Sequence, residues 1–316
     1  MTLINRTACS VLALGLSTGA ALAGGHGDCA TVRFSDVGWT DITATTAATS
    51  VVLEALGYET ETLVLSVPVT YTSLASGDID VFLGNWMPTM EADIAPYRDA
   101  GTVDTVRANL EGAKYTLATN AHGAAMGIAD FADIAAASDA LEGEIYGIEP
   151  GNDGNRLIMD MIAADAFGLG GAEFDVVESS EQGMLAQVAR AVDRGEPIVF
   201  LAWEPHPMNA NFDLTYLTGG DDWFGPDLGG ATVFTNTRAG YSAACPNVGA
   251  LLNNLVFTLA MENEIMGAIL NDGEDPVDAA TAWMSANTDQ VMGWLDGVTT
   301  VDGGDARAAV AAALGM

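Results

Sequence analysis

The chain has 316 residues, of which 49 % are hydrophobic and 17 % charged, so it can form one large domain or two medium ones. This composition excludes a disordered, collagenous or disulfide-dense miniprotein. Asp and Glu number 43 against 10 Lys and Arg, a formal net charge of −33. Nucleic acid and anionic membranes are therefore excluded as partners, since both require positive charge. The acidity is typical of solubility in salty surroundings, and it also attracts cations.

Residues 1–23 are predicted to form a secretory signal peptide. Arg6 precedes an apolar stretch, residues 11–22, and Ala21-Leu22-Ala23 fits the A-x-A cleavage pattern. A membrane anchor is the alternative, but the stretch is too short for a hydrocarbon core of about 30 Å. We expect a periplasmic mature chain that starts near Gly24 and does not insert into the membrane.

Two cysteines, Cys29 and Cys245, remain after removal of this leader. An oxidising compartment favours a disulfide between them, and two buried free thiols are the alternative. The disulfide would link positions 216 residues apart (245 minus 29). We therefore expect both ends of the mature chain in one body.

Short β-rich runs alternate with Ala-rich segments of helical period, a pattern typical of parallel sheets covered by helices. We expect strands at 31–35, 60–65, 79–83, 115–119, 145–148, 174–178, 198–202, 214–217 and 232–235. We expect helices at 42–56, 88–98, 155–166 and 181–194, and a mostly helical final third from Val248. Residues 218–230 are predicted to form a long surface loop anchored by Trp223 and Phe224.

The expected disulfide and this loop together predict two lobes. Residues 24–112 and 214–316 would form lobe I, and residues 113–213 would form lobe II. The chain would cross near 112–114 and again near 213–214, and two crossing strands make a hinge. The predicted fold is α/β, with each lobe a sheet flanked by helices.

Tryptophans stand at the ends of several predicted strands. Ligands of doubly wound sheets bind beyond the carboxyl ends of strands, which is where Trp39, Trp86 and Trp203 lie. Aromatic faces attract cations, so these positions predict a cation pocket, with core packing as the alternative. Packing is the interpretation for the other three: Trp223, Trp283 and Trp294.

Three polar or aromatic positions beside these motifs each have two interpretations. Tyr115 either closes the pocket or is buried in a crossing strand. Asp41 is either a charge partner for a ligand or an N-cap of the next helix, and Asn152 either binds a hydroxyl or caps a helix. No basic residue adjoins the tryptophan motifs, Arg156 being the nearest, so a ligand carboxylate has no charged anchor.

The sequence lacks the catalytic motifs of common enzyme classes. The histidines are His26, His122 and His206, and His206 alone stands among the tryptophan motifs. No H-E-x-x-H pair, Walker loop, G-x-S-x-G elbow or thiolate cluster occurs. We therefore expect a binding protein with no catalytic residue, no metal and no cofactor.

Five segments resemble the periplasmic substrate-binding proteins for quaternary ammonium compounds that serve ABC importers. They are SDVGWTD at 35–41, DVFLGNWMP at 80–88, AKYT at 113–116, GIEPGNDGN at 147–155 and WEPHPM at 203–208. The similarity runs over nearly the whole mature chain and is greatest to the choline-binding members.

This resemblance implies a type II Venus-flytrap fold that closes around its ligand. It assigns six side chains to the ligand: Trp39, Asp41, Trp86, Tyr115, Asn152 and Trp203. The aromatic four would enclose a trimethylammonium group, and the carboxylate and amide would contact the ligand's cationic and hydroxyl ends. Choline is the expected ligand of a monomeric protein that delivers it to an ABC permease.

Glycine betaine and trimethylamine oxide are the alternative ligands. An exported enzyme acting on choline or its esters, and a module serving a chemoreceptor, are alternatives of a different class.

Overall fold

The computed structural model describes residues 29–315, so the predicted signal peptide lies outside the described residues. The strands are β1 (Thr31–Asp36), β2 (Glu59–Val64), β3 (Val81–Met87), β4 (Val103–Asn120), β5 (Glu144–Tyr146), β6 (Asp175–Val177), β7 (Val199–Glu204), β8 (Leu214–Tyr216) and β9 (Gly230–Arg238). Each overlaps one of the predicted strands.

Helices separate and follow these strands. They are α1 (Thr40–Ala55), α2 (Val67–Ser76), α3 (Glu91–Asp99), α4 (Ala121–Ala125), α5 (Phe131–Ile134), α6 (Asp153–Ala163), α7 (Glu181–Arg194), α8 (Met208–Asn211), α9 (Asp221–Phe224), α10 (Pro226–Gly229), α11 (Tyr241–Ala244), α12 (Pro246–Asn254), α13 (Leu259–Gly267), α14 (Pro276–Ala286), α15 (Thr288–Trp294) and α16 (Ala306–Ala313). Among the described residues, no helix is long and apolar enough to cross a bilayer.

The strands join in one ladder of order β2-β1-β3-β9-β4-β7-β5-β6, with β8 paired to β4. β1 is parallel to β2 and β3, and β5 is parallel to β6 and β7, as the alternating pattern predicted. β4 and β9 are antiparallel to their neighbours. Two parallel sheets are therefore connected through an antiparallel centre.

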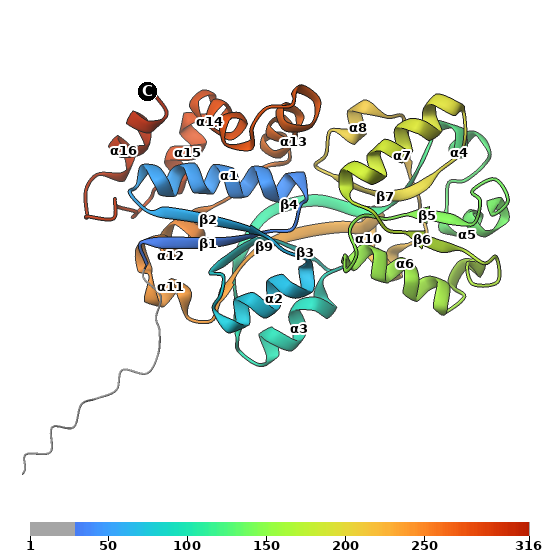
Figure 1. Ribbon diagram of the computed structural model, residues 1–316, viewed down its shortest axis with the longest axis horizontal. Helices are drawn as coiled ribbons and strands as arrows, with labels where there is room; N and C mark the ends of the chain where they lie inside the picture. Colours follow the sequence, from blue (N-terminus) through green and yellow to red (C-terminus); the bar gives the residue numbers. More distant parts are fainter. Residues whose placement is uncertain (1–28, 316) are drawn as a thin grey trace, which may run out of the picture.

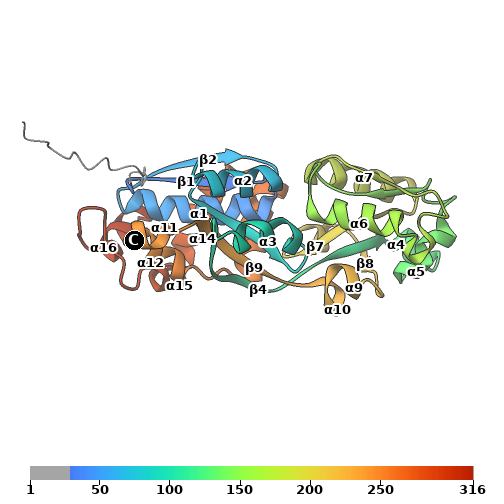
Figure 2. The same ribbon diagram turned by 90° about the horizontal axis from the view of Figure 1, so that it is seen from below.

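Figure 1 shows the two predicted lobes side by side, with β4 and β9 passing between them. Lobe I contains β1–β3 and the carboxyl-terminal helices α11–α16, and lobe II contains β5–β7 and α4–α8. The view from below in Figure 2 shows the same division. The predicted two-lobed α/β fold is confirmed.

Helix α1 is weakly amphipathic because it is covered by protein on opposite sides. It packs against β1 and β3 of the sheet and against α13 and α14, so most of its residues are buried. A helix covered on opposite sides has no need of a charged face. Its Ala and Thr side chains are small enough to allow close approach on both sides.

Strand β4 is much longer than the predicted run 115–119. Its first part, from Val103 to Lys114, pairs with β9, and its continuation from Lys114 to Thr119 pairs with β7. A register shift between Glu111 and Ala113 surrounds Gly112, which has φ 78° and so needs the freedom of glycine. The chain therefore leaves lobe I through a bent but continuous strand.

The return of the chain to lobe I was expected at Leu214. In the structure β8 pairs with Ala118–Asn120 at the end of β4, and α9 packs against α6 of lobe II. The ladder between β9 and β4 begins at Gly230. We propose that the second crossing lies at Gly230 and that lobe II extends to residue 229.

The loop predicted over residues 218–230 contains two short helices, α9 and α10. Phe224 anchors this segment, because its buried ring lies 5.9 Å from that of Tyr115. Trp223 is only half-buried. The predicted surface segment therefore contains two short helical turns, with Phe224 as its buried anchor.

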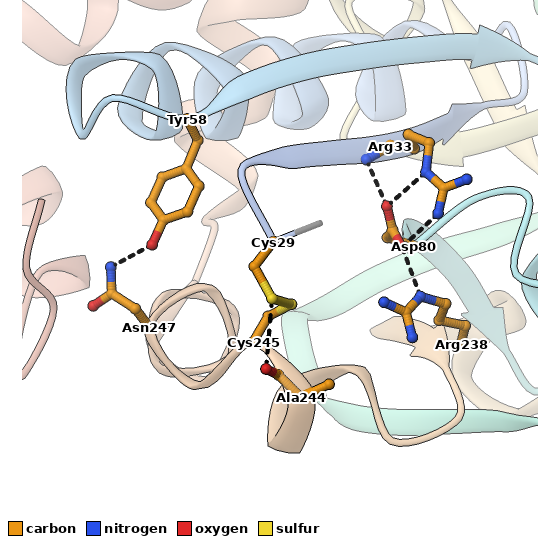
Figure 3. Close-up of a disulfide and its surroundings, with 8 residues drawn as sticks. All are labelled: Cys29, Arg33, Tyr58, Asp80, Arg238, Ala244, Cys245 and Asn247. Atoms are coloured by element: carbon orange, nitrogen blue, oxygen red, sulfur yellow. Dashed lines mark hydrogen bonds and ion pairs between the residues drawn. A yellow bond between two sulfur atoms is a disulfide. The ribbon is translucent and has the colours of Figure 1, made fainter. Parts of the chain in front are cut away.

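Figure 3 shows the predicted disulfide, in which Cys29 ahead of β1 is joined to Cys245 ahead of α12. Their Cα atoms are 5.6 Å apart. Nearby, buried Asp80 accepts from Arg33 Nε at 3.0 Å and from Arg238 Nε at 2.6 Å. The bond and this ion cluster both tie β1 to the later part of the chain, so both ends of the described chain belong to lobe I.

We expect loss of this disulfide to lower the free energy of unfolding by about 2–4 kcal/mol, because the bond closes a long loop in the unfolded chain. Urea unfolding of the protein and of a Cys29→Ser/Cys245→Ser variant, each with and without reductant, measures the effect. Reductant should shift only the parent. Identical midpoints for the two proteins would contradict this role.

Candidate ligand-binding site

A small cavity lies between the lobes. It is lined by Trp39, Asp41, Trp86, Tyr115, Ile148, Asn152, Asp153 and Trp203. All six predicted site residues are therefore brought together, although they come from α1, β3, β4, β7 and the segments beside them. Both lobes contribute to the lining.

The aromatic walls are buried, with 4–5 % of each ring residue exposed, but they face the cavity instead of separate interiors. The ring of Tyr115 lies 6.1 Å from that of Trp86 and 6.2 Å from that of Trp203, both edge-to-face. Trp39 donates from Nε1 to Glu149 Oε1 at 2.9 Å, which joins lobe I to lobe II. Trp86 and Trp203 lie inside β3 and β7, which extend past the predicted strand ends.

Asp41 holds a buried carboxylate at one wall of the cavity. Trp86 Nε1 donates to Asp41 Oδ2 at 3.1 Å, while Oδ1 is buried without a hydrogen-bond partner. Burial, and then the negative charge of Glu181, raise the pKa of Asp41 to about 8. The hydrogen bond from Trp86 lowers the pKa, but by less than burial and Glu181 raise it.

The capping alternative for Asp41 is wrong. Helix α1 begins at Thr40, and its N-cap position is Trp39, which has no side-chain capping bond. Asp41 lies inside the first turn, and its Oδ2 accepts from the Trp86 indole.

Asn152 caps α6, as one interpretation predicted, and it also lines the cavity. Its Oδ1 accepts from Asn155 N at 3.1 Å and from the Tyr115 hydroxyl at 2.9 Å. Gly154 makes the second bond possible, because a Cβ there would come within 2.1 Å of the Tyr115 oxygen. The start of α6 thus fixes the orientation of one aromatic wall.

Asn155 shapes the turn that leads into α6. Its side chain accepts from Ile148 N at 3.0 Å and donates to the carbonyls of Ile148 and Glu149, each at 3.1 Å. This buried amide holds Glu149 in reach of Trp39, so the GIEPGNDGN segment acts as one ordered unit.

The surroundings of the cavity are acidic. Burial raises the pKa of Glu149 to about 7 and that of Asp153 to about 6. None of the described residues that line the cavity is basic, and Arg156 pairs with Asp93, Nη1 to Oδ1, at 2.8 Å. A cation is therefore favoured in this space and an anion is disfavoured.

Sequence reasoning did not select Asp153 and Ile148 as lining residues. Both stand in the GIEPGNDGN motif, which was predicted to lie at the site. The sequence did not indicate which side chains of this motif face the cavity. Glu181 was missed entirely, since an acidic residue in the first turn of a helix is ordinary. His206 is buried and its Nε2 lies 3.1 Å from Glu181 Oε1. Within residues 29–315 no cluster of His, Cys, Asp and Glu is suited to a metal ion.

Two lobes that enclose one small aromatic pocket around their hinge define a protein that captures a ligand by closing on it. The chain belongs to the OpuAC family, described as the substrate-binding domain of ABC-type glycine betaine transport systems, whose model matches residues 30–286. It is therefore the substrate-binding protein of an ABC transport system and not an enzyme.

Known structures and sequences agree with this assignment. The chain is 72 % identical to an ABC-transporter choline-binding protein solved with choline, over 90 % of this chain and 98 % of that one, with a TM-score of 0.89. The unliganded semi-closed form of an ABC-transporter choline-binding protein, also 72 % identical, gives a TM-score of 0.84 over 91 % of this chain and 99 % of that one. The glycine betaine/carnitine transport binding protein GbuC of Listeria monocytogenes is 33 % identical over 41 % of this chain and 42 % of its own length.

Proposed function

We propose that this substrate-binding protein captures choline in the cavity between its lobes and presents it to the permease of an ABC importer. The observation that carries the proposal is an aromatic enclosure beside a buried carboxylate oxygen that lacks a hydrogen-bond partner. A quaternary ammonium group donates no strong hydrogen bond and suits aromatic faces. The 72 % identity to a choline-binding protein supports the same ligand.

The proposed roles follow the chemistry of each side chain. Trp39, Trp86, Tyr115 and Trp203 would enclose the trimethylammonium group. Asp41 would supply the opposite charge, and Asn152 would contact the hydroxyl end. Desolvated cation–π contacts are worth about 2 kcal/mol each, so four walls supply roughly 8 kcal/mol before ordering costs. A micromolar dissociation constant corresponds to about −8 kcal/mol, so micromolar binding is within reach.

Glycine betaine is the second candidate, because the family is described by that ligand. Its carboxylate would enter a cavity lined by Asp41 and Asp153 and by no basic side chain. Like charges in a site of low dielectric constant repel strongly. The lining therefore favours choline over glycine betaine.

We further propose that the protein acts in the periplasm after removal of residues 1–23. The disulfide between Cys29 and Cys245 supports an oxidising compartment. The family's role in ABC transport supports a permease as the protein partner.

Calorimetric titration tests the ligand. We expect choline to bind with micromolar or tighter affinity and glycine betaine to bind more weakly, because only choline lacks a negative charge. Tighter binding of glycine betaine would reverse the order of the two candidates, and no heat or thermal shift with millimolar choline would overturn the proposal.

The four aromatic residues Trp39, Trp86, Tyr115 and Trp203 form the proposed aromatic box. Replacing one of them should weaken choline binding without unfolding the protein. We expect Trp203→Ala to reduce the binding free energy by about 1–3 kcal/mol, through loss of a desolvated cation–π contact. The matched control is Trp283→Ala, because half-buried Trp283 lies on α14 and donates to Glu264 away from the cavity. Equal loss of affinity in both variants would argue against the box.

Choline affinity should rise with pH between about 6 and 8. In the empty pocket Asp41 has its pKa raised to about 8, so the group is mostly protonated at pH 7, and a bound cation favours the ionised form. Binding therefore releases a proton below pH 8. Titrations in buffers of different ionisation enthalpy measure this release.

The Asp41→Asn variant is the control for that experiment, because it removes the main titrating group next to the cation. Its proton release should fall below that of the parent at pH 7. A parent affinity that stays constant from pH 6 to 8.5 would contradict the assignment.

A further inference from the structure

Helix α1 begins at the cavity without a cap from its own sequence. Its N-cap residue, Trp39, makes no side-chain hydrogen bond to the first turn. The acceptor comes from lobe II, where Glu181 Oε2 accepts from Thr40 N at 2.8 Å. Glu181 Oε1 accepts from the Thr40 hydroxyl at 2.6 Å. A carboxylate from one lobe therefore caps a helix of the other lobe.

Glu181 is held in place from behind by His206. Met208 N donates to His206 Nδ1 at 2.9 Å, so the hydrogen of the neutral ring is on Nε2, which donates to Glu181 Oε1 at 3.1 Å. Both side chains are 1 % exposed or less. The His206 ring also lies 4.9 Å from that of Trp203, so the support for Glu181 contacts a wall of the cavity.

Thr40 occupies the position between two cavity residues, Trp39 and Asp41. Neither Thr40 nor Glu181 lines the cavity itself. The bonds between them nevertheless fix the first turn of α1 against lobe II. Any rotation that opens the cleft must break both bonds, since the donors and the acceptor belong to different lobes.

We infer that Glu181 is a positioning residue: it holds the closed cleft through Thr40 and thereby keeps Trp39 and Asp41 against the bound cation, which slows ligand release. This inference rests on the proposed function. The carboxylate is favoured where it stands, because the N-terminus of a helix carries partial positive charge.

The same contact links closure to the presence of a cation. Closing brings the charge of Glu181 near Asp41, and this repulsion is one reason why ionised Asp41 is disfavoured in the empty cavity. A bound quaternary ammonium ion offsets that repulsion. The contact between Glu181 and Thr40, which we call the latch, therefore forms more readily over a filled cavity than over an empty one.

Other contacts between the lobes are less suited to this role. Arg156 and Asp93 form an ion pair, but the Arg156 side chain is 31 % exposed, so water and salt weaken it. Asn211 donates to Asn271 at 2.8 Å in an exposed position. The bond from Trp39 to Glu149 has a carboxylate acceptor but is only partly buried. Of these interlobe contacts between described residues, only the one between Glu181 and Thr40 is fully buried and has a carboxylate acceptor.

Stopped-flow tryptophan fluorescence tests the inference with choline as the probe. We expect Glu181→Gln to raise the dissociation rate constant by about tenfold or more, while the association rate constant changes by about threefold or less. Thr40→Val should also speed dissociation, because it removes the hydroxyl donor and leaves the charge of Glu181 in place. In the double variant, the logarithm of the dissociation rate constant should rise by less than the sum of the two single-variant increases.

Asp193→Asn is the matched control, since it removes one charge from an exposed position of the same helix α7. It should leave both rate constants unchanged. Thermal unfolding of the empty variants checks that they are folded, and Thr40→Val keeps the test decisive should Glu181→Gln fail to fold. Dissociation rates within twofold of the parent in the folded variants would overturn the latch.

The two proposals fail in different ways. A parent protein that gives no signal with choline overturns the proposed function. The latch is then judged by the distance between spin labels on the two lobes, measured without ligand, and a distribution that Glu181→Gln leaves unchanged overturns it.

Discussion

The constraint on which the rest of this structure depends is a carboxylate kept out of water with one oxygen unpartnered. Asp41 lines the aromatic cavity, its Oδ1 is buried without a hydrogen-bond partner, and burial followed by the charge of Glu181 raises its pKa to about 8. An uncompensated buried charge is costly, so this carboxyl group is mostly protonated at neutral pH while the cavity is empty. Every other lining group is aromatic, apolar, amide or acidic, so a cation is the ligand charge that this cavity favours.

Enclosing this carboxyl group requires residues from both lobes. Trp39 and Trp86 come from lobe I, Trp203 comes from lobe II, and Tyr115 comes from the strand that joins them. The separated lobes would each expose part of an apolar wall to water. Bringing them together removes those faces from solvent and surrounds the charge at the same time, so ligand capture and lobe movement form one process.

Much of this arrangement could be predicted from the sequence because the relevant residues stand in short contiguous motifs. The six predicted site residues line one cavity, and the disulfide pairs as expected. The length of β4 could not be predicted, since its pairing partner β9 lies more than a hundred positions later. Glu181 was equally hidden, because its role arises only where α7 meets the start of α1.

The position of Tyr115 on the linking strand gives the lobes unequal tasks. It follows Lys114, where β4 exchanges its partner β9 for β7. Tyr115 lies directly opposite Trp203 in the ladder between β4 and β7, so these two aromatic walls are fixed to each other by backbone pairing, whereas Trp39 and Trp86 belong to the other lobe.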